Sequence, residues 1–169
     1  MLRARFRTAR DAIRAKLEHF VAHGGLGPEP ARAGDLDAVR ALVDAAGLPT
    51  TGVEDAFPSG YAVVRGKSGL LGVAGLERHR DVGLLRSVAV LPSAQRSGVG
   101  RWLVEDRLAA AQDAKLRAVY LLTTTAAAWF RKLGFEDTPR QDVPEALQRA
   151  PEFATVCSSS ATCLVKRLT

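Results

Sequence analysis

An apolar run that leads at once into a glycine-containing turn and then an amphipathic stretch constrains the fold most. Residues 82–91, VGLLRSVAVL, read as a strand closed by Pro92, and residues 99–114 carry apolar side chains on one broad side, as a helix does. The turn between them is QRSGVG, residues 95–100. A second strand, 118–123, is again followed by a helical stretch, AAAWFRKL. This strand–helix–strand–helix order favours parallel pairing of the two strands.

The rest of the chain adds a hairpin before this passage and one strand after it. The expected elements are a helix within 34–47, strands at 61–65 and 70–76, a short helix around 143–148 and a last strand around 161–168. Hairpin strands followed by alternating strands and helices are typical of a mixed sheet covered by helices. We therefore expect a mixed α/β fold, a single domain over residues 28–169 whose central sheet is mixed, partly parallel and flanked by helices.

The first 27 residues differ from the rest in their residue pattern. Apolar residues recur there at steps of three and four, basic residues crowd the remaining positions, and glycines and prolines end the segment. We expect residues 1–27 to form a basic amphipathic helical extension. Its plainest interpretation is a solvated helix, and the alternatives are an interaction arm or an arginine-rich targeting sequence.

The net charge of +6 narrows the class of ligand. A basic surface is typical of proteins that bind nucleic acid, a membrane face or an anionic small molecule. Aromatic residues make up only 6% of the 169 residues and no zinc-finger, RNA-recognition or basic-zipper motif occurs, so nucleic acid is not the expected partner. No apolar run approaches the roughly 18 residues of a membrane helix and no secretion signal is found, so we expect a soluble cytoplasmic protein without a membrane partner.

The QRSGVG turn has the features of a phosphate-binding cradle. It opens a helix, where backbone N–H groups lack partners and the helix dipole is positive. Gly98 and Gly100 let the backbone come close to a ligand, while Arg96 and Arg101 add positive charge. The turn has neither the full G-x-G-x-x-G dinucleotide motif nor the Gly-Lys-Ser/Thr of a P-loop. A glycine turn before a helix is common, so the turn alone leaves an ordinary structural role open.

In combination, LLRSVAVLP, QRSGVGRWLVEDRL, VYLLTT and AAAWFRKLGFE resemble the GNAT (GCN5-related) N-acetyltransferase superfamily over residues 31–135. The resemblance implies a GNAT-like domain that uses acetyl-CoA as cosubstrate and needs no metal. The residues it implies for binding the CoA pyrophosphate are Gln95, Arg96, Ser97, Gly98, Val99, Gly100 and Arg101. It also implies a bulged strand whose Val88, Ala89 and Val90 hold the acetyl group and pantetheine arm, with Phe130 beside the cofactor.

A closer likeness is carried by LLRSVAV, LLTTTAAAWFRKLGF and the tail PEFATVCSSSATC. These segments look like a GNAT subgroup associated with arsenic-resistance operons. The substrate of the subgroup does not follow from this likeness, but we expect the acceptor to be a small amine, amino-acid-like or arsenic-related. The sequence does not name that amine, because the loops that would form its pocket cannot be placed from the sequence.

The expected proton donor of the reaction is missing. Members of the superfamily often supply a Tyr at the position of Phe130, which has no proton to give. A CoA thiol has a pKa near the roughly 8.5 of cysteine, so it can leave as a thiolate, or water or the hydroxyl of Thr124 or Thr125 can protonate it. The alternative is a non-catalytic acyl-CoA or metalloid sensor. We also expect Thr125 to cap the helix that follows it, and Trp129 to lie in the core.

Attack by an amine on a thioester is helped by a base that takes the proton of the amine. Glu77, in GLERHR at the end of a strand, is our candidate catalytic base, acting through water; the alternative is a solvated carboxylate paired with Arg78 or Arg80. His79 is a second candidate base. Arg86 lies in the middle of an apolar strand, where a charge needs a partner. We expect it to bind an anionic group of the substrate, and pairing with a structural carboxylate is the alternative.

The two cysteines, Cys157 and Cys163, are expected to be structural, with Cys163 facing the core from the last strand. Binding of trivalent arsenic by soft thiolates is the alternative. Two cysteines with no histidine nearby do not complete a four-ligand zinc site, so we expect no metal site. A sheet edge at the C-terminal strand could support a homodimer.

Overall fold

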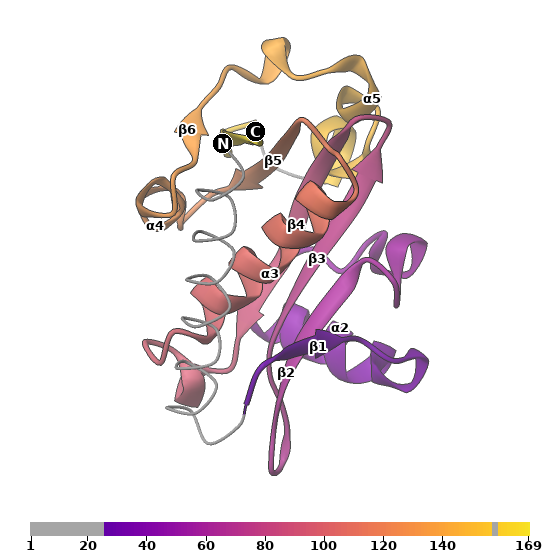
Figure 1. The fold of residues 1–169 in the computed structure, drawn as a ribbon, viewed down its shortest axis with the longest axis vertical. Helices are drawn as coiled ribbons and strands as arrows, with labels where there is room; N and C mark the ends of the chain where they lie inside the picture. The colour runs from indigo at the N-terminus through magenta and orange to yellow at the C-terminus, as the bar shows by residue number, and fades with distance from the viewer. Residues whose placement is uncertain (1–25, 157–158) are drawn as a thin grey trace, which may run out of the picture.

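The computed structural model describes residues 26–156 and 159–169, which fold around a seven-stranded sheet (Figure 1). The strands are β1 Pro28–Pro30, β2 Tyr61–Gly66, β3 Gly69–His79, β4 Val82–Val90, β5 Ala118–Thr123, β6 Glu136–Asp137 and β7 Thr162–Arg167. The helices are α2 Leu36–Ala45, α3 Val99–Asp113, α4 Ala127–Lys132 and α5 Glu145–Gln148. Short turns of 3-10 helix are η1 Ala33–Asp35, η2 Val53–Ala56, η3 Pro92–Ala94 and η4 Arg140–Asp142, and η5 Glu152–Val156 is a π-helical turn. The predicted basic helix falls almost wholly on residues 1–25 and, like Cys157, lies outside the described residues.

The sheet confirms the predicted mixed architecture. Its strand order is β1-β2-β3-β4-β5-β7-β6. The β4–β5 pair is parallel, as the strand–helix–strand order predicts, and the other neighbouring pairs are antiparallel. The central strands and longer helices lie where the hydrophobic pattern puts them, whereas β1 and β6 are two short edge strands that the pattern did not reveal.

Helices cover both faces of the sheet. Successive side chains of a strand point to opposite faces, and neighbouring residues of β4 pack in different hydrophobic clusters. Leu85 of β4 packs with Val104 of α3, and the next residue towards the N-terminus, Leu84, packs with Leu147 of α5. Farther along the sheet, α2 covers β2 and β3 in a third cluster that includes Tyr61. Figure 1 shows α3 lying along one face of the sheet, with α2 on the other.

Strands β4 and β5 separate after a short paired stretch, and this separation positions the site. They pair only from Val82 to Leu84 on β4 and from Ala118 to Tyr120 on β5. Strand β5 stays paired with β7 along its whole length. The later half of β4 is also irregular, because its register with β3 shifts between Val73 and Gly75. Ser87, within that shift, has a positive φ of 53°, which confirms the expected bulge.

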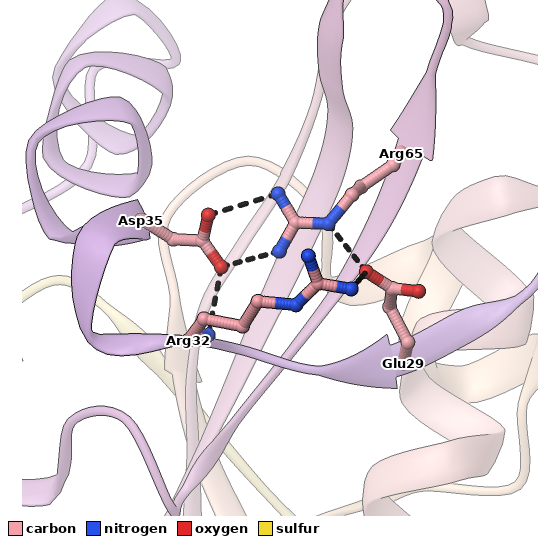
Figure 2. A network of polar contacts seen from close by, with 4 residues as sticks. All are labelled: Glu29, Arg32, Asp35 and Arg65. Atoms are coloured by element: carbon pink, nitrogen blue, oxygen red, sulfur yellow. Dashed lines mark hydrogen bonds and ion pairs between the residues drawn. The ribbon is translucent and has the colours of Figure 1, made fainter.

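A cluster of charged side chains fixes the N-terminal edge of the sheet (Figure 2). The guanidinium of Arg65 on β2 donates to both oxygens of Asp35, with an Nη1–Oδ1 distance of 2.8 Å, and also to Glu29 on β1. Asp35 accepts a further bond from the backbone N–H of Arg32, with a distance of 2.7 Å. The cluster therefore joins β1, the start of α2 and β2.

Among residues 26–156 and 159–169, none of the helices is long and apolar enough to cross a membrane.

Candidate functional site

An open cleft of about 530 Å³ lies where α3 begins, between the end of β4 and helix α4. Its lining residues are Val88, Val90, Gln95, Arg96, Gly98, Gly100, Arg101, Thr125, Ala126, Trp129 and Phe130. A second cavity of about 210 Å³ shares six of these residues and continues between β4 and β5, where Ala89 and Arg86 line it. The structure thus brings most of the predicted cofactor residues into one continuous cleft. Ser97 and Val99 lie in the same turn without lining either cavity.

The turn before α3 presents backbone N–H groups to this cleft. Gly98 is the N-cap of α3 and has φ 89°, a left-handed conformation that glycine adopts readily. The helical hydrogen bonds begin with the N–H of Trp102, which donates to Gly98 O over 3.0 Å. The preceding N–H groups of the first turn therefore have no acceptor within the helix and point to its positive end. An anion is the ligand that such a terminus favours.

A side chain at position 100 would meet the walls of the cleft. A Cβ there would lie 3.3 Å from Val90 Cγ2 and 3.5 Å from Trp129 Cζ2. Gly100 therefore lets the end of β4 and the Trp129 ring approach the start of α3. The cationic residues of the turn differ in their pairing. Arg101 donates to Glu105 over 2.7 Å, whereas Arg96 lines the cleft with the left-handed φ of 63°.

The free edge of β4 directs polar backbone groups into the gap. The N–H of Leu91 donates to Leu71 O of the neighbouring β3 over 2.8 Å. Because successive residues of a strand turn their N–H and C=O to opposite edges, those of Val90 point away from β3. The Gln95 side chain confirms this direction, since its Nε2 donates to Val90 O over 3.2 Å. By the same alternation, the backbone N–H and C=O of Val88 also point into the gap.

A buried polar cluster lies deeper along β4, on the sheet face opposite α3. Arg86 Nη1 donates to Glu77 Oε1 over 2.5 Å and also makes an ion pair with Glu152 of η5. On its other side, Glu77 Oε2 lies 3.2 Å from His79 Nε2. Nη2 of Arg86 donates to the backbone oxygen of Thr51. The side chains of Arg86 and Glu152 are only 5% and 6% exposed, so this is an internal charge network.

Comparison with known proteins identifies the fold. The family model of the acetyltransferase (GNAT) domain matches residues 58–137, which run from before β2 to the end of β6. The architecture also matches solved acetyltransferase structures, one of them described as of the GNAT family, over most of the chain. The fold is that of the GNAT acetyltransferases. Among curated proteins, none matches the sequence.

Several solved structures share this GNAT fold. N-acetylglutamate synthase from Neisseria gonorrhoeae, complexed with coenzyme A and L-arginine, is 23% identical with a TM-score of 0.70, covering 85% of this chain and 33% of its own. Rv2747 from Mycobacterium tuberculosis, complexed with CoA, is 22% identical with a TM-score of 0.72, covering 84% and 99%. The ribosomal-protein-S18-alanine N-acetyltransferase from Escherichia coli is 16% identical with a TM-score of 0.65, covering 85% and 94%. The chain spans about a third of the length of the synthase.

In the GNAT fold of this chain, Trp129 is a wall of the cleft, and its expected place in the core was wrong. The ring is 36% exposed and lines the cleft. It packs at 72° against Phe130, whose ring centroid is 4.8 Å away and which is itself buried. In the six-residue helix α4, the adjacent residues Phe130 and Trp129 point in different directions, Phe130 into the core and Trp129 into the cleft. Because Trp129 stands next to another apolar residue in the sequence, no pattern indicated that it faces the cleft.

The start of α4 also differs from the prediction. Ala126, and not Thr125, stands at the N-cap, and the Ala126 N–H donates to Oγ1 of Thr123 over 3.0 Å. This acceptor lies at the end of β5, three positions earlier, because β5 leads into α4 without a longer loop, and no side chain at the N-cap itself caps the helix. Thr125 instead lines the cleft.

Glu77 is a buried member of β3, not a solvated carboxylate at a strand end. It lies opposite Leu84 of β4, and its partners are Arg86 and His79 in place of Arg78 or Arg80. Burial by itself would raise its pKa, but the hydrogen bonds with His79 and Arg86 outweigh burial and hold the pKa below the ordinary value of 4.5. Glu77 lines neither of the two cavities described above and reaches the cleft through Arg86.

Glu152 is the residue of this cluster that the sequence did not single out. Burial raises the pKa of Glu152, and the nearby Arg86 charge offsets only part of that effect. Arg86 therefore pairs with structural carboxylates, Glu77 and Glu152, as the alternative interpretation of this residue predicted. It also lines the cavity, as binding of an anionic group of the substrate would require. The tail that carries Glu152 lies some 65 positions beyond Arg86 in the sequence, and no spacing pattern links them.

The remaining thiol lies apart from the site. Cys163 is buried in the core beneath α5, as predicted, and is a free cysteine. In the part of the chain that the structure describes, no group of histidines, cysteines and carboxylates is placed to hold a metal ion.

Proposed function

We propose that the chain transfers an acetyl group from acetyl-CoA to the amine of a small, amino-acid-like acceptor. One observation carries the proposal: a single cleft runs from the backbone amides before α3 along the free edge of β4 to the Arg86 cluster. The GNAT fold and the structures of the same fold that hold CoA support acetyl-CoA as donor.

The cofactor end of the cleft would hold the CoA pyrophosphate. Its backbone amides at residues 98–101 suit phosphate oxygens, and Arg96 adds a cation at the rim. Gln95 holds the carbonyl of Val90 and so keeps the turn against the strand. The N–H groups of Val88 and Val90 would then donate to the pantetheine arm and to the acetyl oxygen, where negative charge develops during attack.

The reaction would proceed by direct attack. The nitrogen lone pair of the acceptor forms a bond to the thioester carbon, the carbon–sulfur bond breaks, and its electron pair leaves with the CoA sulfur. The amine proton passes to a base, for which Glu77 stays our candidate, acting through water. Its low pKa keeps it ionised and able to accept a proton, and His79 is in contact to receive the proton next.

The leaving group needs little help in this scheme. Phe130 occupies the place of the usual proton donor, so the CoA sulfur would leave as a thiolate, which a thiol pKa near roughly 8.5 permits. The Thr125 hydroxyl lines the same cleft and is available to protonate it afterwards. Phe130 itself would contact the acyl arm.

The acceptor would be anchored by Arg86, which lines the inner cavity beside the bulge. A carboxylate is the group that a buried guanidinium pairs with best. Amino-acid acceptors fit this chemistry, and a synthase of N-acetylglutamate is among the proteins of the same fold. The likeness of LLRSVAV and the tail to the arsenic-resistance subgroup makes arsenic-containing amino-acid analogues part of the same proposal.

Calorimetric titration with acetyl-CoA and CoA tests the proposal. We expect micromolar binding that Gly98→Trp abolishes, because the indole would fill the cradle. Gly34→Trp is the matched control, since open space surrounds Gly34 and it lines none of these cavities. It should bind as the native chain does. Binding followed by thiol release with amines supports the transferase, and binding without release in a broad amine screen favours the sensor alternative. No binding by the folded protein would overturn the proposal.

A further inference from the structure

The Arg86 cluster contains buried polar atoms that the protein does not satisfy. Within the described residues, both carboxyl oxygens of Glu152 and the Nε of Arg86 are buried without a hydrogen-bond partner, and the one charged contact of Glu152 Oε1 is its ion pair with Arg86 Nη1. Glu152 is 4% exposed. Folded proteins pair almost all buried polar groups, so orphaned groups of opposite charge at one place point to a ligand that supplies their partners.

These atoms border a small cavity that leads to the candidate site. The cavity has a volume of about 60 Å³, and its lining includes Arg86, Ser87 and Glu152. It shares five lining residues with the 210 Å³ cavity between β4 and β5, namely Leu48, Leu85, Arg86, Ser87 and Leu122. A group held here therefore lies beside the Ser87 bulge, next to the strand edge proposed to hold the acetyl group.

The orphaned atoms have complementary chemistry. Glu152 Oε1 is in ion-pair contact with Arg86 Nη1, but neither carboxyl oxygen accepts a hydrogen bond, which an ammonium can donate. Arg86 Nε lacks an acceptor, which a carboxylate supplies. The Glu152–Arg86 ion pair is also positioned for exchange. An acceptor that carries both charges replaces one internal pair by two, so neither buried charge loses its partner. A neutral amine or a simple carboxylic acid leaves one of them unpaired.

We propose that Glu152 is a specificity-determining residue of the acceptor pocket, which with Arg86 selects acceptors whose amine lies beside a carboxylate. The inference rests on the proposed function. Glu152 binds the ammonium form, which then gives one proton through water to Glu77, the candidate base, before the neutral amine attacks. The tail turn η5 thereby contributes to substrate choice, although it lies outside the stretch that the GNAT family model matches.

Steady-state kinetics with matched acceptors tests this role. The panel is the twenty L-amino acids, their α-carboxamides and 2-hydroxy acids as competitive inhibitors, assayed by thiol release at saturating acetyl-CoA. We expect amino acids to be used and the carboxamides to have KM values at least tenfold higher. Glu152→Gln should raise the KM for amino acids about 10- to 100-fold, as expected for loss of a hydrogen-bonded charge. The hydroxy acids, which lack the ammonium, should inhibit this variant and the native chain within about twofold of each other.

Controls separate this role from a structural one. Glu145→Gln makes the same change on the exposed side of α5 and should leave all constants unchanged, since its side chain is 74% exposed. Glu152→Asp keeps the charge and should recover part of the affinity if Glu152→Gln proves unstable. Acetyl-CoA titration of each variant reports on the donor site, which should be unaffected.

The outcomes distinguish the two proposals. Tight acetyl-CoA binding with equal use of amino acids and carboxamides, or with an unchanged KM in Glu152→Gln, overturns the role of Glu152 and leaves the transferase intact. Tight binding with no amino acid used overturns it too. Failure of the native chain to bind acetyl-CoA overturns both.

Discussion

Arg86 Nη1 donates to Glu77 Oε1 across the β3–β4 pair, with a distance of 2.5 Å between the two atoms. The register makes this contact: Arg86 lies opposite Gly75, and Glu77 lies two residues farther along β3 on the same face. Gly75 leaves room there for the Tyr61 ring, since a Cβ at position 75 would lie 2.6 Å from Tyr61 Cζ. The ion pair is thus enclosed by the sheet itself and held at the wall of the inner cavity.

We expect Glu77→Gln to reduce kcat/KM about 100-fold, because the amide cannot take the proton of the amine. The pKa of Glu77 is below 4.5, so the native carboxylate is ionised throughout the neutral range. The midpoint of any loss of native activity due to this group should therefore lie below pH 4.5. A pH profile of kcat/KM checks this, with Glu136→Gln, an exposed carboxylate, as control. If Glu77→Gln retains native kcat, Glu77 acts only as the partner of Arg86.

We expect Asp35→Asn to lower the free energy of unfolding by about 1–2 kcal/mol, because the buried side chain loses its charged bonds with Arg65. Hydrogen bonding from Arg65 lowers the pKa of Asp35 below 3.8. The stabilisation is therefore present above that value and is lost as the pH falls through the folded-state pKa. Urea unfolding at pH 7 and pH 3 measures both effects.

The matched control for this cluster is Asp137→Asn. Asp137 also receives two bonds from one guanidinium, that of Arg131, but on the exposed surface. Solvent screens such a pair, so Asp137→Asn should lower the free energy of unfolding much less than Asp35→Asn does. Equal losses in the two variants would show that burial does not strengthen the Arg65 cluster.

The sequence predicted what depends on local pattern. Hydrophobic periodicity located the central strands and the longer helices, because each buries one side within a few residues. The QRSGVG turn predicted a left-handed glycine at the start of a helix, and Gly98 at φ 89° before α3 confirms it, because both follow from adjacent residues. Its role as a phosphate cradle stays a prediction. The bulge at Ser87 came from the family resemblance, as no residue there signals an irregular strand.

What the sequence did not reveal depends on contacts between distant segments. Glu152 meets Arg86 only because the tail returns across the sheet after β6, and Glu29 meets Arg65 only because β1 joins the edge. Trp129 lines the cleft because β4 and β5 separate there, which a single apolar residue does not disclose. The fold was therefore more predictable than the charge pairing within it.

We expect Trp129→Ala to weaken acetyl-CoA binding roughly 2- to 10-fold, which is the contribution of one aromatic contact. The exposed ring lies over Gly100 and forms one wall of the cleft. Leu91→Ala is the matched control, because Leu91 is also 36% exposed but does not line the cleft. Calorimetry should separate the two variants, and equal affinities would remove Trp129 from the cofactor site.

Cys163 should resist thiol reagents in the native protein. Burial raises the pKa of its thiol to about 11 from an ordinary 9.0, so at pH 8 the thiolate fraction is about 100-fold lower than in an exposed cysteine. In a Cys157→Ser variant, the one remaining thiol should react with a chromogenic disulfide only as fast as the chain opens. Urea should therefore accelerate the labelling.

The same raised pKa makes a prediction for alkaline stability. A group whose pKa is higher in the folded state stabilises that state below its unfolded pKa and loses this contribution as the pH rises through the folded value. Relative to Cys163→Ala, the native chain should therefore lose stability between about pH 9 and about pH 11. Urea unfolding of both proteins across this range measures the difference, in which the other titrating groups cancel. Rapid labelling of Cys163 at pH 8 together with a constant stability difference would contradict its place in the core beneath α5.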